Sequence, residues 1–329
     1  MIVTRSPYRI SFFGGGTDYH EWFSENKGSF LSLAVNYYTY ITLRVKPSFQ
    51  EKEYRVLWRY AEEVNSIKDI RHPIVRETLK HLKFDRGLDI SYIGDLPGGS
   101  GIGSSSAFTA ALIFALYSQI NKKINPYELA YESYNIEKNK LKETVGIQDQ
   151  IATSFGGFNY VNIEKDSSYS LSKVNLTSEN QDIFLNSLLL VYTGKTRRAS
   201  DIAEEKVKGI KKKYSSVMEM QNMTPLGFQY LNNMDLENFG RLLSESWGLK
   251  RSLSKSISSS EIDDLYKFGI KEGAIGGKLL GAGGGGFMLF VCKEGMKENL
   301  ISKLNGRVIV PFKISNSGTK LVYKEEPLT

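Results

Sequence analysis

The pattern of hydrophobic and polar positions predicts strands and helices that alternate along the first half of the chain. Runs rich in β-branched and aromatic residues predict strands over 2–13, 38–45 and 88–93. The segment from Ser104 to about residue 120 is apolar on nearly every side. A helix with this pattern has no face suited to water, so we expect it to be central and buried.

A second helix is predicted from its start signals. Asn125 is suited to the N-cap position, Pro126 to the first helical position, and Glu128 completes a capping box. This helix is expected to run past Glu137.

The second half shows a new apolar strand followed by helices and further strands. In order, the pattern predicts a strand within 182–193, a long charged helix, an amphipathic helix from 235–239, a strand over 287–292, a helix near 294–304, and a final strand pair around Val308 and Leu321. Strands mixed with helix pairs favour a split βαβ, ferredoxin-like C-terminal half. The polar stretch 176–182 places a domain boundary near residue 180, which gives domains 1–180 and 181–329.

The bulk composition is that of an ordinary globular protein. The chain has 329 residues, 41% hydrophobic and 24% charged, enough for two modest cores. Its longest apolar runs, such as 188–191 and 287–292, are too short to span a bilayer, and Arg5 and Arg9 interrupt any signal-peptide core. The single cysteine, Cys292, excludes an intramolecular disulfide. We therefore expect a soluble cytoplasmic protein.

The formal charge of +7 changes this picture little. The densest basic cluster lies within 206–213 and is typical of a solvated helix face, without interleaved aromatic residues or zinc-ligand spacing. We expect no nucleic-acid partner and no membrane partner. A basic balance suits small anionic ligands equally well.

The strongest candidate for chemistry is the glycine- and serine-rich loop between the strand at 88–93 and the helix at 104–120. It reads Leu-Pro-Gly-Gly-Ser-Gly-Ile-Gly-Ser-Ser-Ser over 96–106. Glycines allow close backbone approach, and the free N–H groups of a helix N-terminus favour an anion. The loop lacks the Gly-Lys-Ser/Thr ending of a Walker motif, and alone it could be only a tight connection.

Two more glycine-rich segments accompany this loop. Residues 6–19 read Ser-Pro-Tyr-Arg-Ile-Ser-Phe-Phe-Gly-Gly-Gly-Thr-Asp-Tyr, and residues 278–290 read Lys-Leu-Leu-Gly-Ala-Gly-Gly-Gly-Gly-Phe-Met-Leu-Phe. The latter contains Gly-x-Gly-x-x-Gly, but a strand rather than a helix follows, so the dinucleotide fingerprint does not apply. In order and spacing, the three segments resemble the three motifs of the GHMP small-molecule kinases over essentially the whole chain.

This resemblance implies an α+β, two-lobed GHMP kinase fold. The N-terminal lobe would be a split βαβ, ATP-binding lobe, the C-terminal lobe would be ferredoxin-like, and the active site would lie between them. ATP and Mg²⁺ are the implied cofactors. The implied nucleotide-binding residues are Pro97, Gly98, Gly99, Ser100, Gly101, Ile102, Gly103, Ser104, Ser105 and Ser106.

The resemblance also implies the metal ligands. A serine hydroxyl and one carboxylate suit Mg²⁺. Ser105 is the expected hydroxyl, with Ser104 second, although either could serve only as a helix N-cap. Glu137 is the expected carboxylate, with Glu132 and Glu143 as alternatives.

Asp149, in a Gly-x-x-Asp context, and Arg9 are the implied catalytic residues. An arginine nearby weakens a carboxylate as a base, so Asp149 is expected to orient the hydroxyl or accept its proton late. It could instead cap a helix over 150–155. An arginine inside a hydrophobic strand is costly unless paired, so Arg9 indicates a buried carboxylate.

The first motif indicates the substrate. Asp18, with Thr17 and Gly16, matches the residues that accept hydrogen bonds from sugar hydroxyls. The Gly-Gly-Gly-Thr-Asp version, without the Glu-His pair of galactokinases, resembles the branch of heptose 7-phosphate kinases and fucokinases, which phosphorylate the anomeric hydroxyl. Fucokinases are usually much longer, which favours a heptose 7-phosphate substrate.

A phosphorylated substrate needs a second anion site. Lys195, Arg197 and Arg198 follow a strand and open a helix, so they are the candidates, although they could be surface charges. Gly283 and Gly284 are expected to shape the substrate pocket. The expected partner is a small-molecule sugar phosphate, and the protein would be a monomer or homodimer. The alternatives are a kinase of a neutral sugar, a non-catalytic relative that senses ATP and sugar, and a nucleic-acid-binding protein of related topology.

Overall fold

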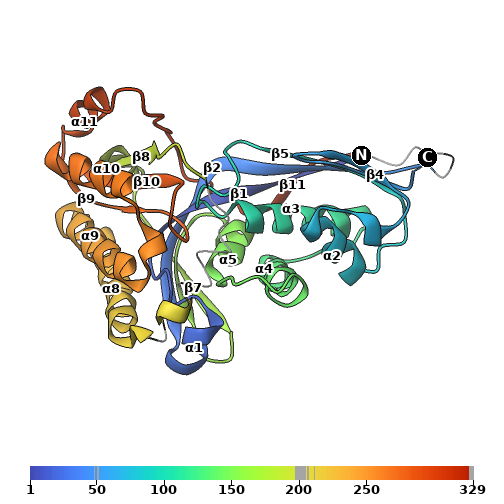
Figure 1. Cartoon of the computed structure of the whole chain (residues 1–329), viewed down its shortest axis with the longest axis horizontal. Coiled ribbons are helices and arrows are strands. Elements are labelled where there is room, and N and C mark those ends of the chain that lie inside the picture. The colour runs from blue at the N-terminus through green and yellow to red at the C-terminus, as the bar shows by residue number, and fades with distance from the viewer. Residues whose placement is uncertain (48, 50–51, 197–204, 206, 211, 326–329) are drawn as a thin grey trace.

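The structure is a computed structural model that describes residues 1–47, 49, 52–196, 205, 207–210 and 212–325. It has two lobes, each built on its own β-sheet (Figure 1). The two-lobed α+β fold expected from the sequence is confirmed.

The larger sheet is organised around two long strands, β1 (Ile2–Phe13) and β2 (Gly28–Val45), which pair with each other along most of their length. The other edge of β2 is shared by β6 (Phe158–Ile163) and β5 (Leu88–Gly94). The remaining strands are β3 (Tyr54–Leu57), β4 (Ala61–Val64), β7 (Tyr169–Lys173) and β11 (Lys320–Lys324), and the main order is β11-β1-β2-β5-β3-β4.

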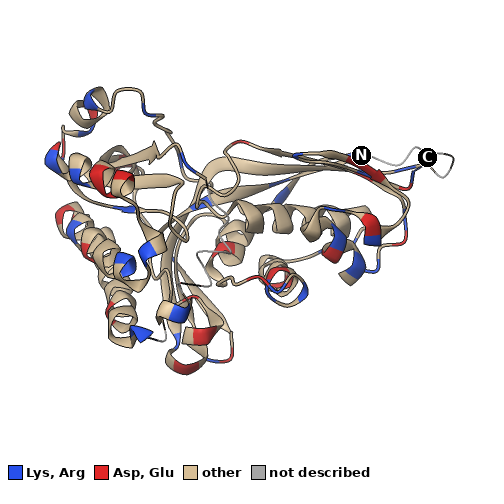
Figure 2. Cartoon of the chain, viewed as in Figure 1, with Lys and Arg blue, Asp and Glu red and all other residues tan. Residues whose placement is uncertain are grey.

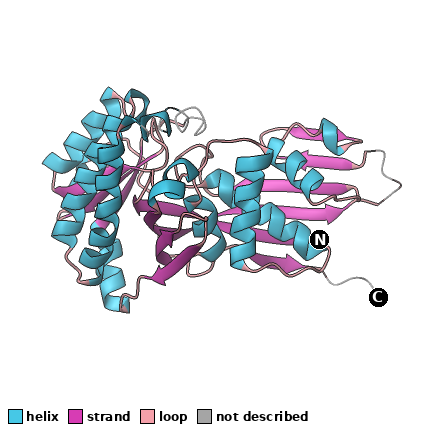
Figure 3. Ribbon diagram, turned by 90° about the horizontal axis from the view of Figure 1, so that it is seen from below, coloured by secondary structure: helices cyan, strands magenta, loops and turns pink. Residues whose placement is uncertain are grey.

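Four helices cover one face of the larger sheet (Figures 1 and 3). They are α2 (Pro73–His81), α3 (Ser104–Gln119), α4 (Pro126–Asn135) and α5 (Gln148–Phe155). Helix α3 is buried over most of its length, as its uniformly apolar sequence predicts. Helix α4 begins with the expected capping box of Asn125 and Glu128, and a π-helical turn, η2 (Ile136–Lys140), continues it past Glu137.

The C-terminal sheet has the order β8-β10-β9, with bounds Leu188–Tyr192, Phe287–Cys292 and Ala274–Leu279. Both pairs are antiparallel, so β8 and β9 run parallel with β10 between them. A bridge from Ile309 to Val191 extends the sheet beyond β8. This is the split βαβ, ferredoxin-like arrangement expected for this lobe.

The remaining helices lie in the C-terminal half, apart from two short ones. They are α6 (Ser178–Ser187), α8 (Tyr214–Asn232), α9 (Leu236–Leu253), η3 (Lys255–Ile257), α10 (Ser260–Lys271) and α11 (Lys297–Lys303), with α1 (His20–Asn26) and η1 (Ile67–Asp69) in the N-terminal half. Helix α9 begins at Asp235, whose side chain accepts from the Asn238 N–H as an N-cap.

In the larger sheet the parallel strands β3 and β5 are direct neighbours, and β4 pairs with the outer edge of β3. One detail differs from the sequence-based expectations. The final strand pair was wrong. The segment around Val308 stays beside β8, whereas Leu321 belongs to β11, which pairs with β1 in the other sheet. The boundary predicted near residue 180 falls within α6 and stays a prediction.

A shared hydrophobic core joins the lobes. Phe12 of β1 contacts Phe158, Phe184 and Phe239 with ring centroids 5.4 to 5.8 Å apart. Such close aromatic packing fixes the lobes against each other. In the part of the chain that the structure describes, no helix is both long and apolar enough to cross a membrane. In the view of Figure 2, charged residues are spread over both lobes rather than gathered in one basic stripe.

Candidate active site

A cavity of about 830 Å³ is lined by residues from all three glycine-rich segments. Arg9 and Asp18 come from the first segment, the loop around Gly98–Ser106 from the second, and Gly281 from the third. Asp149 of α5 also lines it, so one site receives residues that are up to 273 positions apart in the sequence.

The loop between β5 and α3 forms one wall of the cavity. Gly99, Gly101 and Gly103 have φ angles of 71°, 79° and 76°, in the left-handed region that favours glycine. Since the N-cap of α3 is Gly103, which has no side chain to cap the first turn, neither Ser104 nor Ser105 is the N-cap. The amides at this helix start are therefore suited to an anion.

Not every residue of this loop faces the cavity. Gly98, Gly99, Gly101, Gly103 and the three serines line it. Ser100 is buried and donates to the Pro97 carbonyl, while the Ile102 carbonyl accepts from the Arg9 N–H. Pro97, Ser100 and Ile102 therefore hold the loop in shape.

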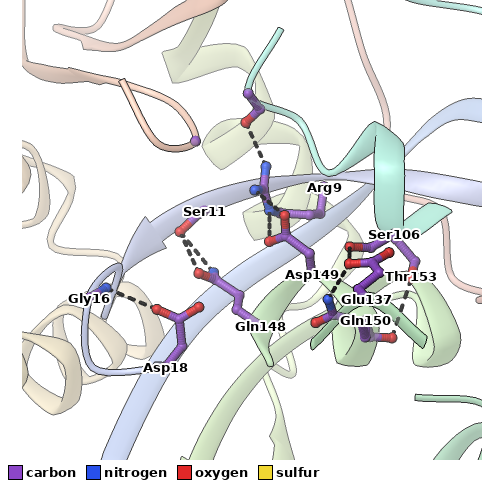
Figure 4. A network of polar contacts seen from close by, with 12 residues as sticks. Arg9, Ser11, Gly16, Asp18, Ser106, Glu137, Gln148, Asp149, Gln150 and Thr153 are labelled. Carbon is purple, nitrogen blue, oxygen red and sulfur yellow. Dashed lines mark hydrogen bonds and ion pairs between the residues drawn. The ribbon is translucent and has the colours of Figure 1, made fainter. Parts of the chain in front are cut away.

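Arg9 and Asp149 form a bidentate ion pair at the base of the cavity (Figure 4). The Arg9 Nε and Nη2 atoms donate to the two Asp149 carboxylate oxygens, both at 2.7 Å. The Arg9 Nη1 atom donates to the Gly101 carbonyl at 2.6 Å. Arg9 is 4% exposed. The expected carboxylate partner is present, although its side chain is only partly buried, and the pair is held to the glycine-rich loop by the Gly101 carbonyl.

Asp149 lies in the first turn of α5, whose N-cap is Ile147. The alternative N-cap role for Asp149 was therefore wrong. A Cβ added to Gly103 would lie 3.2 Å from the Arg9 Cγ and 3.5 Å from an Asp149 carboxylate oxygen. The backbone of the loop thus packs directly against the ion pair.

Glu137 lies beneath the start of α3, on the η2 turn. Its side chain is fully buried, and one carboxylate oxygen accepts from Ser106 Oγ at 2.9 Å and from Gln150 Nε2 at 2.7 Å. The other oxygen, Oε1, has no hydrogen-bond partner among the described residues. Burial raises the pKa of Glu137 to about 7. A nearby cation would favour the charged form.

These groups fit a magnesium ion. A buried carboxylate oxygen without a partner and nearby serine hydroxyls are the hard oxygen ligands that Mg²⁺ prefers. Ser106 donates to Glu137, while Ser105, the hydroxyl expected to face the metal, is exposed at the cavity wall, and its role stays a prediction. Of the alternatives, Glu132 pairs with His81 at 2.9 Å, and Glu143 lines the cavity.

Asp18 enters the cavity from the turn after β1. Its Oδ1 accepts from the Gly16 N–H at 2.9 Å, and a Cβ on Gly146 would collide with its Oδ2. Thr17 is buried and donates to the Gly14 and Ser29 carbonyls. Of the three residues expected to bind the sugar, Asp18 lines the cavity, whereas Gly16 and Thr17 shape the turn that presents it.

The third glycine-rich segment connects β9 to β10 and packs on the second. A Cβ on Gly281 would collide with the Gly101 Cα, and one on Gly286 would collide with the Ser100 carbonyl. Gly281 and Ala282 line the cavity. Gly283 and Gly284 face Ile257 instead, and the Gly284 N–H donates to its carbonyl at 2.9 Å. The structure does not bring these two glycines into the cavity wall.

Of the three residues expected to form a second anion site, the structure describes Lys195. Lys195 Nζ lies 2.9 Å from Glu261 Oε1, and its side chain is not among the lining residues. The next residue, Thr196, does line the cavity. Arg197 and Arg198 lie outside the described residues.

Two buried lysines in the cavity wall were missed by the sequence analysis. Lys278 of β9 donates to the Phe12 carbonyl at 2.6 Å, and Lys250 of α9 donates to the Leu279 and Gly281 carbonyls. For Lys278 the available signal was a lysine inside a buried strand, which is the same argument that singled out Arg9. Trp58, Arg59 and Pro73 also line the cavity.

Comparison with known proteins adds a family context to this geometry. The models for the GHMP kinases N terminal domain and the GHMP kinases C terminal region match residues 68–157 and 228–309, which together make just over half of the chain. A D-glycero-alpha-D-manno-heptose 7-phosphate kinase from Campylobacter jejuni is 29% identical, with 97% of this chain and 98% of that protein covered.

Two further proteins, one similar in sequence and one in structure, also match this chain over nearly its whole length. A bifunctional fucokinase/GDP-fucose pyrophosphorylase from Arabidopsis thaliana is 27% identical over 94% of this chain but only 32% of its own length. The crystal structure of a D-glycero-D-manno-heptose 1-phosphate kinase from Bacteroides thetaiotaomicron superimposes with a TM-score of 0.81 at 20% identity, covering 99% of this chain and 100% of that one. At that identity the likeness establishes a shared fold.

Proposed function

The chain belongs to the GHMP kinase family, and on that premise we propose that it transfers the γ-phosphoryl group of ATP to the anomeric hydroxyl of D-glycero-D-manno-heptose 7-phosphate, giving the 1,7-bisphosphate. As a family member it is a phosphotransferase with an alcohol group as acceptor. The observation that carries the proposal is the Arg9–Asp149 pair, held by Gly101 of the glycine-rich loop and sharing one cavity with Asp18.

The phosphate groups of ATP would lie on the amides of the 98–106 loop at the start of α3. Trp58 and Pro73, which line the same cavity, offer an aromatic and apolar surface for the adenine ring. Glu137 and the serines of 104–106 would hold Mg²⁺, which neutralises phosphate charge during transfer. Phosphoryl transfer needs little covalent work from the protein, so positioning and charge placement dominate.

Asp149 would orient the attacking hydroxyl and receive its proton as the bond to phosphorus forms. The Arg9 guanidinium holds that carboxylate in place through two hydrogen bonds, and its own positive charge would lie beside the transferred phosphoryl group. Asp18 would accept hydrogen bonds from further sugar hydroxyls. Each role matches a side chain that already lines the cavity.

The heptose phosphate is favoured over a neutral sugar by the Gly-Gly-Gly-Thr-Asp sequence and by the name of the Campylobacter jejuni relative, which is aligned over 97% of this chain. A fucokinase-like activity is the alternative, supported by the plant bifunctional enzyme. Arg197 and Arg198 remain our candidates for the 7-phosphate. Cytoplasmic location and a monomer or homodimer also stay predictions.

The test is ADP release with Mg-ATP against heptose 7-phosphate, fucose, galactose and mannose, with phosphorus NMR of any product. An anomeric phosphate formed from the heptose phosphate alone would support both reaction and substrate. Turnover of a neutral sugar alone would move the assignment to the alternative. ATP binding without turnover of any sugar would favour a non-catalytic relative.

A further inference from the structure

Two cavity-lining side chains, Ser11 and Gln148, have no role in the proposed reaction so far. Ser11 lies on β1 two residues after Arg9, and Gln148 opens α5 immediately before Asp149. The Gln148 Nε2 atom donates to Ser11 Oγ at 2.8 Å, and Ser11 Oγ also lies 3.2 Å from Gln148 Oε1 (Figure 4). Both residues line the cavity, and they are 5% and 3% exposed.

Gln148 is placed between the two aspartates. On one side it is bonded in sequence to Asp149, and on the other the Ile147 N–H donates to the Asp18 carbonyl at 2.9 Å. In the view of Figure 4, its carboxamide lies between the carboxylates of Asp18 and Asp149. A sugar that reaches both aspartates therefore has to pass along Gln148.

The chemistry of the pair suits a sugar hydroxyl. A carboxamide has two N–H donors and a carbonyl acceptor, and its described hydrogen bonds are to Ser11 alone. Ser11 thus fixes the orientation of the amide while leaving it capacity for a further partner. A buried amide in a binding cavity is costly when that capacity is unused, so a ligand lacking the matching hydroxyl is disfavoured.

We propose that Gln148, oriented by Ser11, binds the hydroxyl on the ring carbon next to the anomeric carbon and thereby selects the sugar at carbon 2. Gln148 is the residue next to Asp149, and the 2-hydroxyl is the hydroxyl next to the anomeric one. Hydroxyls on adjacent carbons lie about one hydrogen-bond length apart, so neighbouring side chains can bind them. This proposal rests on the proposed function, because it takes Asp149 as the residue at the anomeric hydroxyl.

The experiment is a cycle that combines Gln148→Met with removal of the 2-hydroxyl. kcat/KM is measured for wild type and variant with D-glycero-D-manno-heptose 7-phosphate and with its 2-deoxy analogue. With wild type we expect the deoxy analogue to lose about 10- to 100-fold. The variant should lose a similar factor with the full sugar and show no further loss with the analogue, while KM for ATP stays within about twofold.

The proposal would be overturned if the variant lost kcat/KM on removal of the 2-hydroxyl by the same factor as wild type. The effects of the substitution and of the missing hydroxyl would then be independent, which would mean that Gln148 does not contact that hydroxyl. Gln229→Met, an exposed glutamine on α8, is the matched control and should behave as wild type in every arm. If Gln148→Met does not fold, Ser11→Ala serves in the same cycle, with a smaller but still non-additive loss expected. Failure of wild type to phosphorylate any sugar would instead count against the proposed function.

Discussion

Two glycine-rich loops meet at the cavity, and they use glycine for opposite reasons. The loop of residues 98–103 precedes a helix and presents its backbone to the cavity, and a Cβ on Gly98 would meet no atom within 4 Å. The loop of residues 281–286 connects two strands, and a Cβ on Gly281 would collide with the Gly101 backbone. Gly98 of the first loop leaves room for a ligand, whereas Gly281 of the second leaves room for Gly101 of the first, and the close contact at Gly101 is mutual.

This comparison separates the two walls of the site. The N-terminal wall carries Arg9, Asp149, Glu137 and the start of α3, which are the groups that we propose bind or stabilise charge. The C-terminal wall fixes the position of these groups through backbone contacts. Lys250 Nζ supports this wall by donating to the Gly281 carbonyl at 2.6 Å. Similar composition therefore does not mean similar function, and the element that follows each loop distinguishes them.

Among the substitutions in the N-terminal wall, Asp149→Asn should have the largest effect on activity. The amide keeps the volume of the side chain but removes the negative charge that, in the proposed reaction, orients the hydroxyl and accepts its proton. We expect kcat to fall by about 10²- to 10⁴-fold and KM for ATP to change little, as measured by steady-state ADP release. Asp182→Asn, on the exposed side of α6, is the control. An unchanged kcat would remove Asp149 from the chemistry.

The matched pair Gly281→Ala and Gly98→Ala tests the comparison directly. Gly281 has a φ angle of 68° and contacts Gly101, so its substitution should lower the free energy of unfolding by about 2–4 kcal/mol. Gly98→Ala should change it by less than about 0.5 kcal/mol, although it can raise KM for ATP. Urea unfolding of both variants gives the values. Equal destabilisation would contradict the distinction between the loops.

The sequence predicts the elements around the site better than the contacts within it. Strand β1, helix α3 and the capping box at Asn125 were predictable because local hydrophobic pattern and turn chemistry determine them. The pairing of Arg9 with a carboxylate followed from the cost of an arginine in a buried strand. The elements are predicted by local sequence patterns, and the ion pair is predicted by one charged residue in an apolar strand.

Other features depend on contacts between distant segments and carry no such signal. That Ser106 rather than Ser105 reaches Glu137 depends on the rotation of α3 against the η2 turn. That Gly283 faces Ile257, outside the cavity, depends on how the loop docks on η3. Strand β11 pairs with β1 across more than 300 positions, and a short apolar run does not reveal which sheet it joins.

His72 supports the N-terminal wall and predicts a pH dependence of stability. It lies at the start of α2, stacks on Phe108 and contacts Trp58, which lines the cavity. Burial lowers its pKa to about 4. Because the unfolded chain binds this proton near pH 6.5, the stability due to neutral His72 is present above that pH. It is lost as pH falls through about 4.

The expected loss due to His72 is on the order of 3 kcal/mol between pH 6.5 and pH 4. His72→Asn keeps an N-cap side chain without the titrating group, so its stability should fall less steeply over this window. Thermal unfolding of both proteins across the window measures the two slopes. Parallel slopes would show that His72 is not the titrating group, whatever the absolute stabilities.

Lys195→Met should have the smallest effect, and it tests whether the C-terminal wall also binds substrate. Lys195 pairs with Glu261 on the surface, and its side chain does not line the cavity. We therefore expect an unchanged unfolding temperature and a KM for heptose 7-phosphate within about twofold of wild type, because exposed ion pairs contribute little.

Lys250→Met is the contrasting variant, since its ammonium group lies in the cavity wall and donates to the Gly281 carbonyl. A KM that rises more than about tenfold for Lys195→Met alone, with KM for ATP unchanged, would make the 195–198 segment a substrate-binding element. The C-terminal wall would then carry charge recognition as well as shape.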